Sequence, residues 1–153
     1  MDEKKFKYGD ILSRFKDCPE LDCNEVERDV YRWVHSKPSA EDFIPLPLMP
    51  DIDKRPIDLT DLKNHSCEAF SLSMWVDKDK AKQKLLNFIV KHPPELRAEY
   101  IDRKGDTIGL IHIKKEYGKC SPPNKKGHIS LFEYEGVELH ECIADLFYIF
   151  ETK

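Results

Sequence analysis

The sequence predicts a single α+β domain, residues 1–153, built on a mostly antiparallel sheet of four or five strands with one main helix packed on it. Three observations predict this class. Residues 77–91 carry a clear amphipathic helical pattern, while several other segments are rich in the β-branched and aromatic residues that strands favour. A chain of 153 residues has the commonest single-domain size, and two domains would each have too little core. Eight Phe, six Tyr and two Trp supply large core side chains.

The N-terminal part is predicted to hold a short helical region and one element of either kind. A helical region is expected within residues 2–15, interrupted by Gly9. Its apolar residues lie near helical spacing: Phe6, Ile11, Leu12 and Phe15. Residues 26–35 follow Asn24, which could cap a helix, but their valines and aromatic residues suit a strand equally. Helix and strand both stay open for this segment.

Residues 37–58 are predicted to form an extended segment lying across the domain surface. Five prolines remove backbone donors and bias the preceding residues to extended geometry: Pro38, Pro45, Pro47, Pro50 and Pro56. The segment is too apolar for a flexible linker, because it also contains Phe43, Ile44, Leu46, Leu48 and Met49. We expect these apolar side chains to pack down onto the domain.

The central strand–helix unit is the firmest local prediction. After a short helical turn between residues 58 and 65, residues 67–76 alternate strongly enough for a strand. Asp77 is a suitable N-cap for the main helix, which carries apolar residues on one face to about Lys91. Pro93 and Pro94 then stop it.

The last third is predicted to supply most of the remaining strands. Residues 98–102 and 107–114 are expected to pair as a hairpin through the turn at Gly105. Residues 128–134 follow as a strand, after a polar loop from 118 to 127 that is long enough to be functional. Residues 141–150 fit a helix or a strand.

Charge and composition disfavour several classes of protein. The formal net charge is −4, and the basic residues are interleaved with acidic ones, so no nucleic-acid partner is expected. The densest basic stretches are residues 78–84 and 114–126. No membrane association is expected, because no apolar run approaches the roughly 20 residues that span a bilayer. The start of the chain lacks the apolar region of a signal peptide, and the five cysteines are odd in number. We therefore expect reduced thiols and a cytoplasmic location.

Metal and nucleophile patterns are sparse. His65-Ser66-Cys67 and His140-Glu141-Cys142 repeat a His-x-Cys pattern, but the tight ligand pairs of structural zinc are missing, so no metal site is predicted. Cys120 is the best candidate for a reactive thiol, since the lysines near it would favour the thiolate. The scattered glycines exclude a phosphate-binding Gly-rich loop.

One constellation suggests an enzyme. Arg32, then Ser71 and Ser73, then Glu133 and Glu135 follow the chain in that order. This order resembles the Arg, Ser-x-Ser and Glu-x-Glu pattern of ADP-ribosyltransferases that use NAD. The resemblance implies that the arginine holds a phosphate of NAD and that the serine strand supports the nicotinamide side. The last glutamate would stabilise the positive charge that develops on the sugar.

A second pattern covers about residues 30 to 135 and resembles a group of small, uncharacterised bacterial proteins. It comprises Arg32, Asp42-Phe43-Ile44-Pro45, Cys67 with Ser71-Leu72-Ser73-Met74-Trp75, Ala81, and Gly127-His128-Ile129-Ser130-Leu131-Phe132. Such proteins are often encoded among defence or toxin genes. The resemblance directs attention to Asp42 with Phe43 and to His128, which follows the polar loop and could act as a general base or ligand.

Two functions are carried forward. The first is a binding or accessory protein of a bacterial conflict system, which captures a partner protein through an apolar patch: Phe43, Ile44, Leu46, Leu48 and Met49. It predicts that Phe43→Ala with Leu46→Ala removes partner capture and leaves the fold intact. The alternative is an NAD-dependent ADP-ribosyltransferase-like enzyme, and only this alternative implies a cofactor, NAD. Its candidate catalytic residues are Arg32, Ser71, Ser73, His128, Glu133 and Glu135. The oligomeric state stays open.

Overall fold

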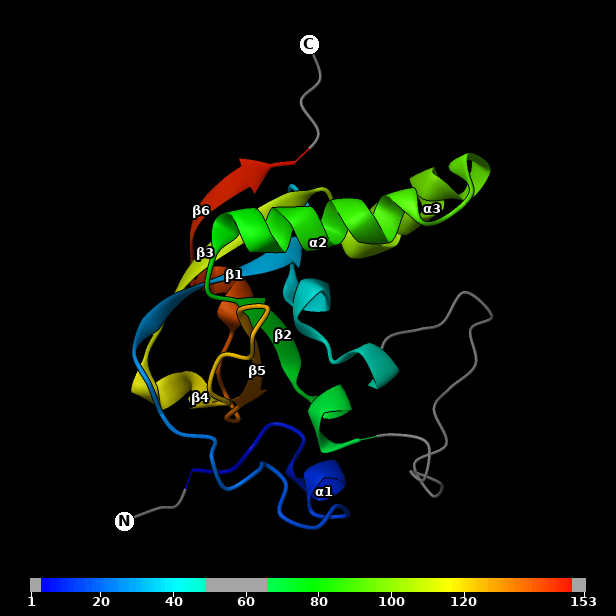
Figure 1. The fold of residues 1–153 in the computed structure, drawn as a ribbon. Coiled ribbons are helices and arrows are strands. Elements are labelled where there is room, and N and C mark those ends of the chain that lie inside the picture. Colours follow the sequence, from blue (N-terminus) through cyan, green and yellow to red (C-terminus); the bar gives the residue numbers. More distant parts are fainter. Residues whose placement is uncertain (1–3, 49–65, 150–153) are drawn as a thin grey trace.

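A six-stranded antiparallel sheet forms the centre of the computed structural model of the chain (Figure 1). The structure describes residues 4–48 and 66–149. The strands follow the order β4-β5-β2-β1-β3-β6 across the sheet. Their bounds are β1 Arg28–Val34, β2 Leu72–Trp75, β3 Thr107–Ile113, β4 Gly118–Cys120, β5 His128–Glu133 and β6 Ile143–Tyr148. The predicted α+β class and the largely antiparallel sheet are confirmed, with six strands in place of four or five.

The main helix is α2, Lys78–Val90, as the sequence predicts. Asp77 caps it, since its carboxylate accepts hydrogen bonds from the backbone N–H groups of Asp79 at 2.8 Å and Lys80 at 3.1 Å. Ala81, Leu85 and Ile89 form its buried stripe, four residues apart. Within the described residues, no helix is both long enough and apolar enough to cross a membrane.

The predicted strand at 98–102 is wrong, because these residues belong to the helix α3, Pro94–Lys104. Proline suits the first turn of a helix, so Pro94 begins this helix as well as following the end of α2. Gly105 ends it with φ +93°, and a Cβ there would lie 2.2 Å from the carbonyl oxygen of Val34. The turn assigned from Gly105 is therefore a helix C-terminus.

The two ambiguous segments are both strands. β1 pairs with β3 over seven residues, from Arg28 opposite Ile113 to Val34 opposite Thr107. The C-terminal segment forms β6 on the other side of β3. The predicted N-terminal helical region shortens to α1, Gly9–Leu12.

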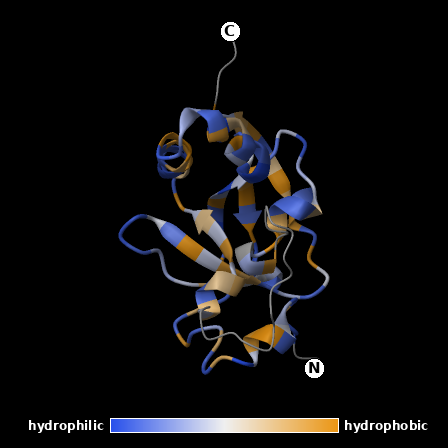
Figure 2. Ribbon diagram, turned by 90° about the vertical axis from the view of Figure 1, so that its right-hand side faces the viewer, coloured by the Kyte–Doolittle hydropathy of each residue, from blue (hydrophilic) through white to orange (hydrophobic). Residues whose placement is uncertain are grey.

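Two apolar layers cover the two faces of the sheet, and hydrophobic and hydrophilic residues alternate along several strands (Figure 2). One face packs against α2 and α3 through a cluster that includes Trp75, Leu85 and Ile108. The opposite face carries a second cluster that includes Met74 and Ile111. The helices therefore lie on the face that presents Trp75.

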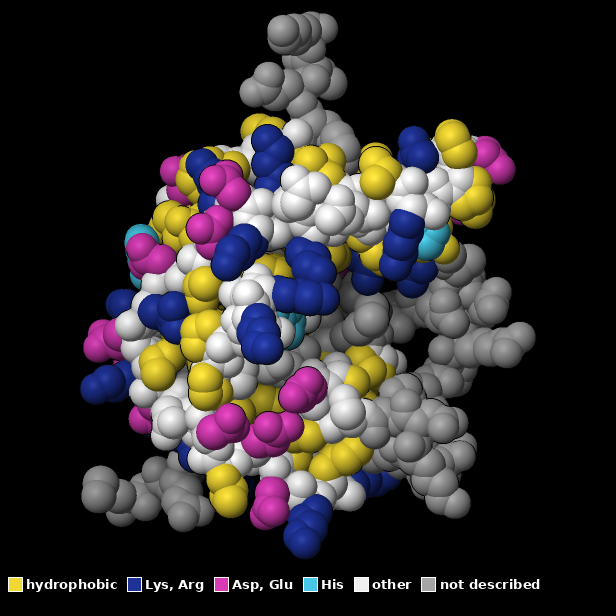
Figure 3. Space-filling model, in the orientation of Figure 1, with side chains coloured by type: hydrophobic (Ala, Val, Ile, Leu, Met, Phe, Trp, Pro, Cys, Tyr) yellow, Lys and Arg dark blue, Asp and Glu magenta, His cyan; other side chains and the backbone are white. Residues whose placement is uncertain are grey.

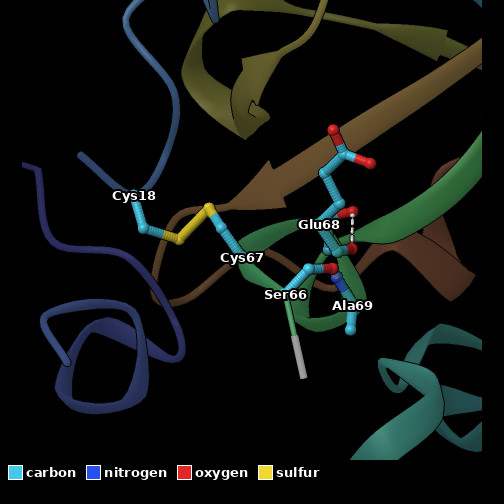
Figure 4. The surroundings of a disulfide bond; sticks show 6 residues. Cys18, Ser66, Cys67, Glu68 and Ala69 are labelled. Atoms are coloured by element: carbon cyan, nitrogen blue, oxygen red, sulfur yellow. Dashed lines mark hydrogen bonds between the residues drawn. A yellow bond between two sulfur atoms is a disulfide. The ribbon is translucent and has the colours of Figure 1, made fainter. Parts of the chain in front are cut away.

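A third cluster joins the N-terminal segment to the sheet. Leu12 and Cys23 pack there against Phe70 and Phe132. A disulfide between Cys18 and Cys67 closes the same region (Figure 4). The expectation of five reduced thiols is therefore wrong for this pair, because the fold brings two cysteines 49 residues apart within bonding distance. The remaining three, Cys23, Cys120 and Cys142, are free.

The proline-rich segment turns rather than running extended in its described part. It forms the 3-10 helices η1, Ala40–Phe43, and η2, Leu46–Leu48. A third one, η3 Cys67–Phe70, occupies the first half of the strand predicted at 67–76. The remainder of the 37–58 segment and the helical turn predicted between 58 and 65 fall within 49–65, outside the described residues.

Phe43 is a core residue, in line with the inward packing expected for this segment, and its burial conflicts with its proposed role in a partner-binding patch. Its side chain is 4% exposed and packs in the same cluster as Met74 and Ile111. The expectation that Phe43→Ala leaves the fold intact therefore conflicts with its burial, because the substitution leaves a cavity in that cluster.

We predict that Phe43→Ala lowers the free energy of unfolding by about 3–5 kcal/mol, the usual cost of removing a buried aromatic side chain. Val90→Ala is the matched control, since Val90 is 56% exposed and surface substitutions usually change stability by less than about 0.5 kcal/mol. Urea unfolding of both variants measures the difference. Equal stability of the two variants would contradict the core position of Phe43.

Candidate functional site

Backbone pairing between β1 and β2 is short, and the side chain of Arg32 lies where the two strands separate. The two strands pair at Tyr31 and Trp75, and Arg32 bridges the next position. Its Nη1 donates to the Ser73 carbonyl at 2.7 Å and its Nε to the Asp42 carbonyl at 2.8 Å. The guanidinium carbon also lies 5.4 Å from the centroid of the Phe43 ring. Arg32 therefore joins β1, β2 and η1 where strand pairing ends.

A pocket of about 660 Å³ lies beside this opening, a volume within the range of small-molecule sites. Strands β1 and β2, the turns η1, η2 and η3, and the helices α2 and α3 all contribute to it. The described residues that line it are Arg32, Trp33, Glu41, Asp42, Ile44, Pro47, Glu68, Ala69, Ser71, Ser73, Trp75, Phe88, Arg103 and Lys104. The sheet thus supplies its floor and the helices one wall.

Aromatic rings form the apolar part of the pocket. Trp33 and Trp75 stack with their ring centroids 4.9 Å apart and their planes 14° apart. Phe88 of α2 extends the group, 6.2 Å from Trp33. The Trp33 indole N–H donates to the Ala81 carbonyl at 2.9 Å, which fixes the ring. The buried Trp75 indole N–H has no acceptor among the described residues.

Cations gather on the α3 side of the pocket. Arg103 and Lys104 occupy the last turn of α3 and are half-buried. Burial lowers the pKa of Lys104, and the positive charges of Arg103 and Arg32 lower it further. Burial also lowers the pKa of Arg32, to about 10, although nearby carboxylates partly offset this effect. The charges of Arg103 and Arg32 are therefore near enough to Lys104 to disfavour its protonated form.

His35 holds two walls of the pocket together. Its Nδ1 lies 2.5 Å from Asp42 Oδ1, and its Nε2 lies 2.5 Å from the Asp102 carbonyl at the end of α3. Asp42 is also held by the backbone N–H of Ser39 at 3.0 Å. Desolvation lowers the pKa of His35, but a carbonyl and a carboxylate are both acceptors, so the two contacts favour the doubly protonated ring and raise the pKa overall. His35 thereby fixes η1 against the end of α3.

The polar groups of the pocket come mainly from η1, η3 and the start of β2. The Ser71 hydroxyl donates to the Glu68 carbonyl at 2.6 Å and so continues the η3 turn. Ser73 is half-buried on the same sheet face as Trp75. Glu41 and Glu68 are exposed at the rim. Two carboxylates thus stand at the mouth, a third, Asp42, is buried in the lining and bound to His35, and two of the cations come from the last turn of α3.

The structure brings together half of the candidate catalytic residues. Arg32, Ser71 and Ser73 line the pocket. His128 shares the sheet face of Ser73, opposite Trp75 in the register, and its ring meets the Trp75 ring edge-on at 5.4 Å. It is not among the described lining residues.

The two candidate glutamates lie elsewhere. Glu135 is exposed after the end of β5. Glu133 is 3% exposed, on the sheet face opposite to Ser73, where Lys7 donates to its Oε2 at 2.8 Å. Burial raises the pKa of Glu133, while Lys7 and then Arg32 act to lower it. Its Oε1 has no partner among the described residues.

The predicted partner-binding residues are similarly divided. Ile44 lines the pocket, and Leu48 packs against the N-terminal cluster. Phe43 is in the core, as described above. The side chain of Leu46 and all of Met49 lie outside the described residues. In the described part, the segment therefore packs inward and contributes to the pocket.

The metal and thiol patterns have structural explanations in the described residues. Cys67 is in the disulfide, and no group of three His, Cys, Asp or Glu side chains in the described ranges is arranged to hold a metal ion. Cys120 is 3% exposed, and burial with the nearby Cys23 raises its pKa to about 12. The proposed reactive thiolate at Cys120 is therefore contradicted, since the thiol stays protonated.

Sequence reasoning missed several residues of the site: Trp33, His35, Glu41, Glu68, Phe88, Arg103 and Lys104. The cations were missed because their helix was read as a strand. The sequence patterns pointed to Asp42 but not to its contact with His35. These two residues are seven positions apart across a turn, where neither a helical nor a strand repeat predicts contacts. The Arg103-Lys104-Gly105 run is itself a helix C-terminus signal, with basic residues before a glycine.

None of three comparisons with known proteins, by family model, by curated sequence and by solved structure, gives a match to the chain.

We predict that His35 makes the stability of the protein fall as the pH rises. Desolvation disfavours the charged ring, but the hydrogen bonds to the Asp102 carbonyl and to Asp42 outweigh it and raise the pKa above 6.5. A raised pKa stabilises the folded state fully below about pH 6.5, and this stabilisation is lost as the pH rises through the folded pKa.

The measurement is chemical denaturation between about pH 6 and pH 8, the range in which histidine titrates. Wild type should lose more stability over this range than His35→Gln, because glutamine does not titrate. Parallel pH profiles for the two proteins would show that His35 does not carry the effect.

Proposed function

We propose that the protein binds an anionic small molecule with a planar ring, the chemistry of a nucleotide, in the pocket beside Arg32. The observation that carries the proposal is the pairing of an aromatic surface with clustered cations in one cavity. The aromatic rings of Trp33 and Phe88 would stack on, or meet edge-on, the planar ring of the ligand. Arg103 and Lys104 would donate hydrogen bonds to its phosphate oxygens. Pockets with apolar walls and a few convergent polar groups are typical ligand sites.

The cations also have a simpler role, which accounts for only part of their arrangement. Basic residues in the last turn of a helix interact favourably with its dipole. An interaction with the helix dipole requires neither that Arg103 and Lys104 be half-buried nor that Arg32 of β1 lie near them. The crowding of Lys104 against both arginines costs free energy in the empty pocket, and a bound anion would relieve it.

Calorimetric titration with ADP, adenosine and inorganic phosphate tests the proposal. ADP should bind more tightly than either fragment, because it alone engages both the aromatic surface and the cations. Arg103→Ala with Lys104→Ala should weaken ADP binding at least about tenfold, since a hydrogen bond to a charged group contributes about 1.5–3 kcal/mol.

The matched control is Lys114→Ala with Lys115→Ala, which removes the same charge at exposed positions outside the pocket. This control should bind ADP like wild type. Absence of ADP binding by wild type, or equal weakening by both double variants, would refute the proposal.

NAD-dependent ADP-ribosyl transfer is the second candidate function. The specific observation in its favour is that Arg32, Ser71 and Ser73 line one pocket. The reaction also needs a carboxylate near the sugar. Since Glu133 and Glu135 stand away from the lining, Glu68 and Glu41 at the rim are the carboxylates best placed for that role.

Incubation with NAD, followed by detection of released nicotinamide and of labelled protein, tests this candidate. If transfer occurs through the rim, Glu68→Gln should abolish nicotinamide release while NAD still binds. If it occurs as the sequence order implies, Glu135→Gln should do so. NAD binding without any nicotinamide release would leave binding alone as the function.

Capture of a partner protein in a bacterial conflict system stays a prediction from the sequence. Ile44 and Leu48 are the members of its patch that are half-buried in the described residues. A cytoplasmic location also stays a prediction, and the Cys18–Cys67 disulfide is more typical of oxidising compartments. Counting free thiols in protein purified under non-reducing conditions, three or five, would separate the two environments.

A further inference from the structure

Two clusters of like charge lie on one face of the molecule. Figure 3 shows Lys and Arg side chains gathered below α2, and Asp and Glu side chains gathered further down the same face. We call Lys80, Lys84 and Lys126 the basic patch, and Glu20, Asp22 and Glu68 the acidic patch. His128 follows Lys126 by two residues and lies near both patches: burial lowers its pKa, while the charge of Glu68 acts to raise the pKa and that of Lys84 to lower it.

The basic patch joins the two lysine-rich stretches of the sequence. Lys84 of α2 and Lys126 of the 121–127 loop lie next to each other, and this contact lowers the pKa of Lys84. Lys80 reaches the same loop, since a Cβ on Gly127 would lie 3.5 Å from its Nζ. In the described part of the chain, none of these lysines has a carboxylate within ion-pair distance.

The acidic patch is built by the disulfide. Figure 4 shows Cys18 bonded to Cys67, the residue before Glu68. Glu20 follows Cys18 by two residues and lies near Glu68, because the Glu68 charge acts on it. The proximity of Glu68 is the main reason why the pKa of Glu20 is raised. No cation of the described residues forms an ion pair with these carboxylates.

An unusually exposed apolar residue stands within the acidic patch. Leu21 is 87% exposed, the highest value among the large hydrophobic residues described. It lies between Glu20 and Asp22 in the sequence. A single exposed apolar side chain is ordinary surface by itself. Leu21 bears on an interface only because it stands among carboxylates that form no ion pair with the described residues.

We propose that this face binds a second copy of the chain around a two-fold axis that passes near His128. Such an axis, lying in the interface, places the basic patch of one copy on the acidic patch of the other, twice. Leu21 then packs against the aliphatic stems of the partner copy's lysines. One symmetric contact would then neutralise both like-charge clusters, which form no ion pair with the described residues of their own chain.

Sedimentation velocity over a concentration series tests the proposal. Wild type should form a dimer at low salt that dissociates at about 1 M salt, where the Debye length is about 3 Å. Lys84→Glu with Lys126→Glu, and separately Glu20→Lys with Asp22→Lys, should each be monomeric. The second variant avoids the pocket, so its result is independent of ligand binding.

An equimolar mixture of the two reversal variants gives the decisive result. One variant carries two acidic patches and the other two basic ones, so the mixture should form a heterodimer. Lys114→Glu with Lys115→Glu is the control and should dimerise like wild type. A wild type that is monomeric at all concentrations, or a mixture that stays monomeric while wild type dimerises, would overturn the proposal.

Discussion

The site depends on the side chain of Arg32, which replaces strand pairing where β1 and β2 part. Its bonds to the Ser73 and Asp42 carbonyls satisfy backbone acceptors that would otherwise lose their partners beside the sheet opening. The separation leaves room for a pocket in the middle of the sheet rather than at its edge. The planar guanidinium of Arg32 presents several N–H donors in a fixed geometry, so one side chain holds both carbonyls at once.

The polar network around Arg32 sets the shape of the pocket. Asp42 is shared by the backbone of η1 and the ring of His35, and His35 in turn holds the carbonyl end of α3. The cations of α3 therefore keep a fixed position relative to the aromatic pair on the sheet. Breaking this network would cost free energy, because the buried carboxylate of Asp42 would lose hydrogen-bond partners. Proton loss from His35 is the point at which the network is weakest.

The sequence predicted an element correctly where all the residues that specify it lie close together in the chain. The Asp77 cap and the apolar stripe of α2 specify that helix, and the alternation within residues 67–76 indicates β2, which forms the second half of that segment. The strand β1 was ambiguous because valine and tryptophan positions alone do not separate the two periods. Arg32, Ser71 and Ser73 were singled out from their order in the chain. The links from His35 to Asp42 and to α3 depend on three-dimensional contacts, so no spacing in the sequence contained them.

Both tryptophans of the chain, Trp33 and Trp75, line the pocket, so the indole N–H signals in an NMR spectrum report directly on its occupancy. The most direct test is to titrate isotope-labelled protein with ADP and follow these two signals. We expect the Trp75 N–H, which has no acceptor among the described residues, to shift strongly with ADP and only weakly with adenosine or phosphate alone. Unchanged indole signals at saturating ADP would contradict the assignment of this pocket as the ligand site.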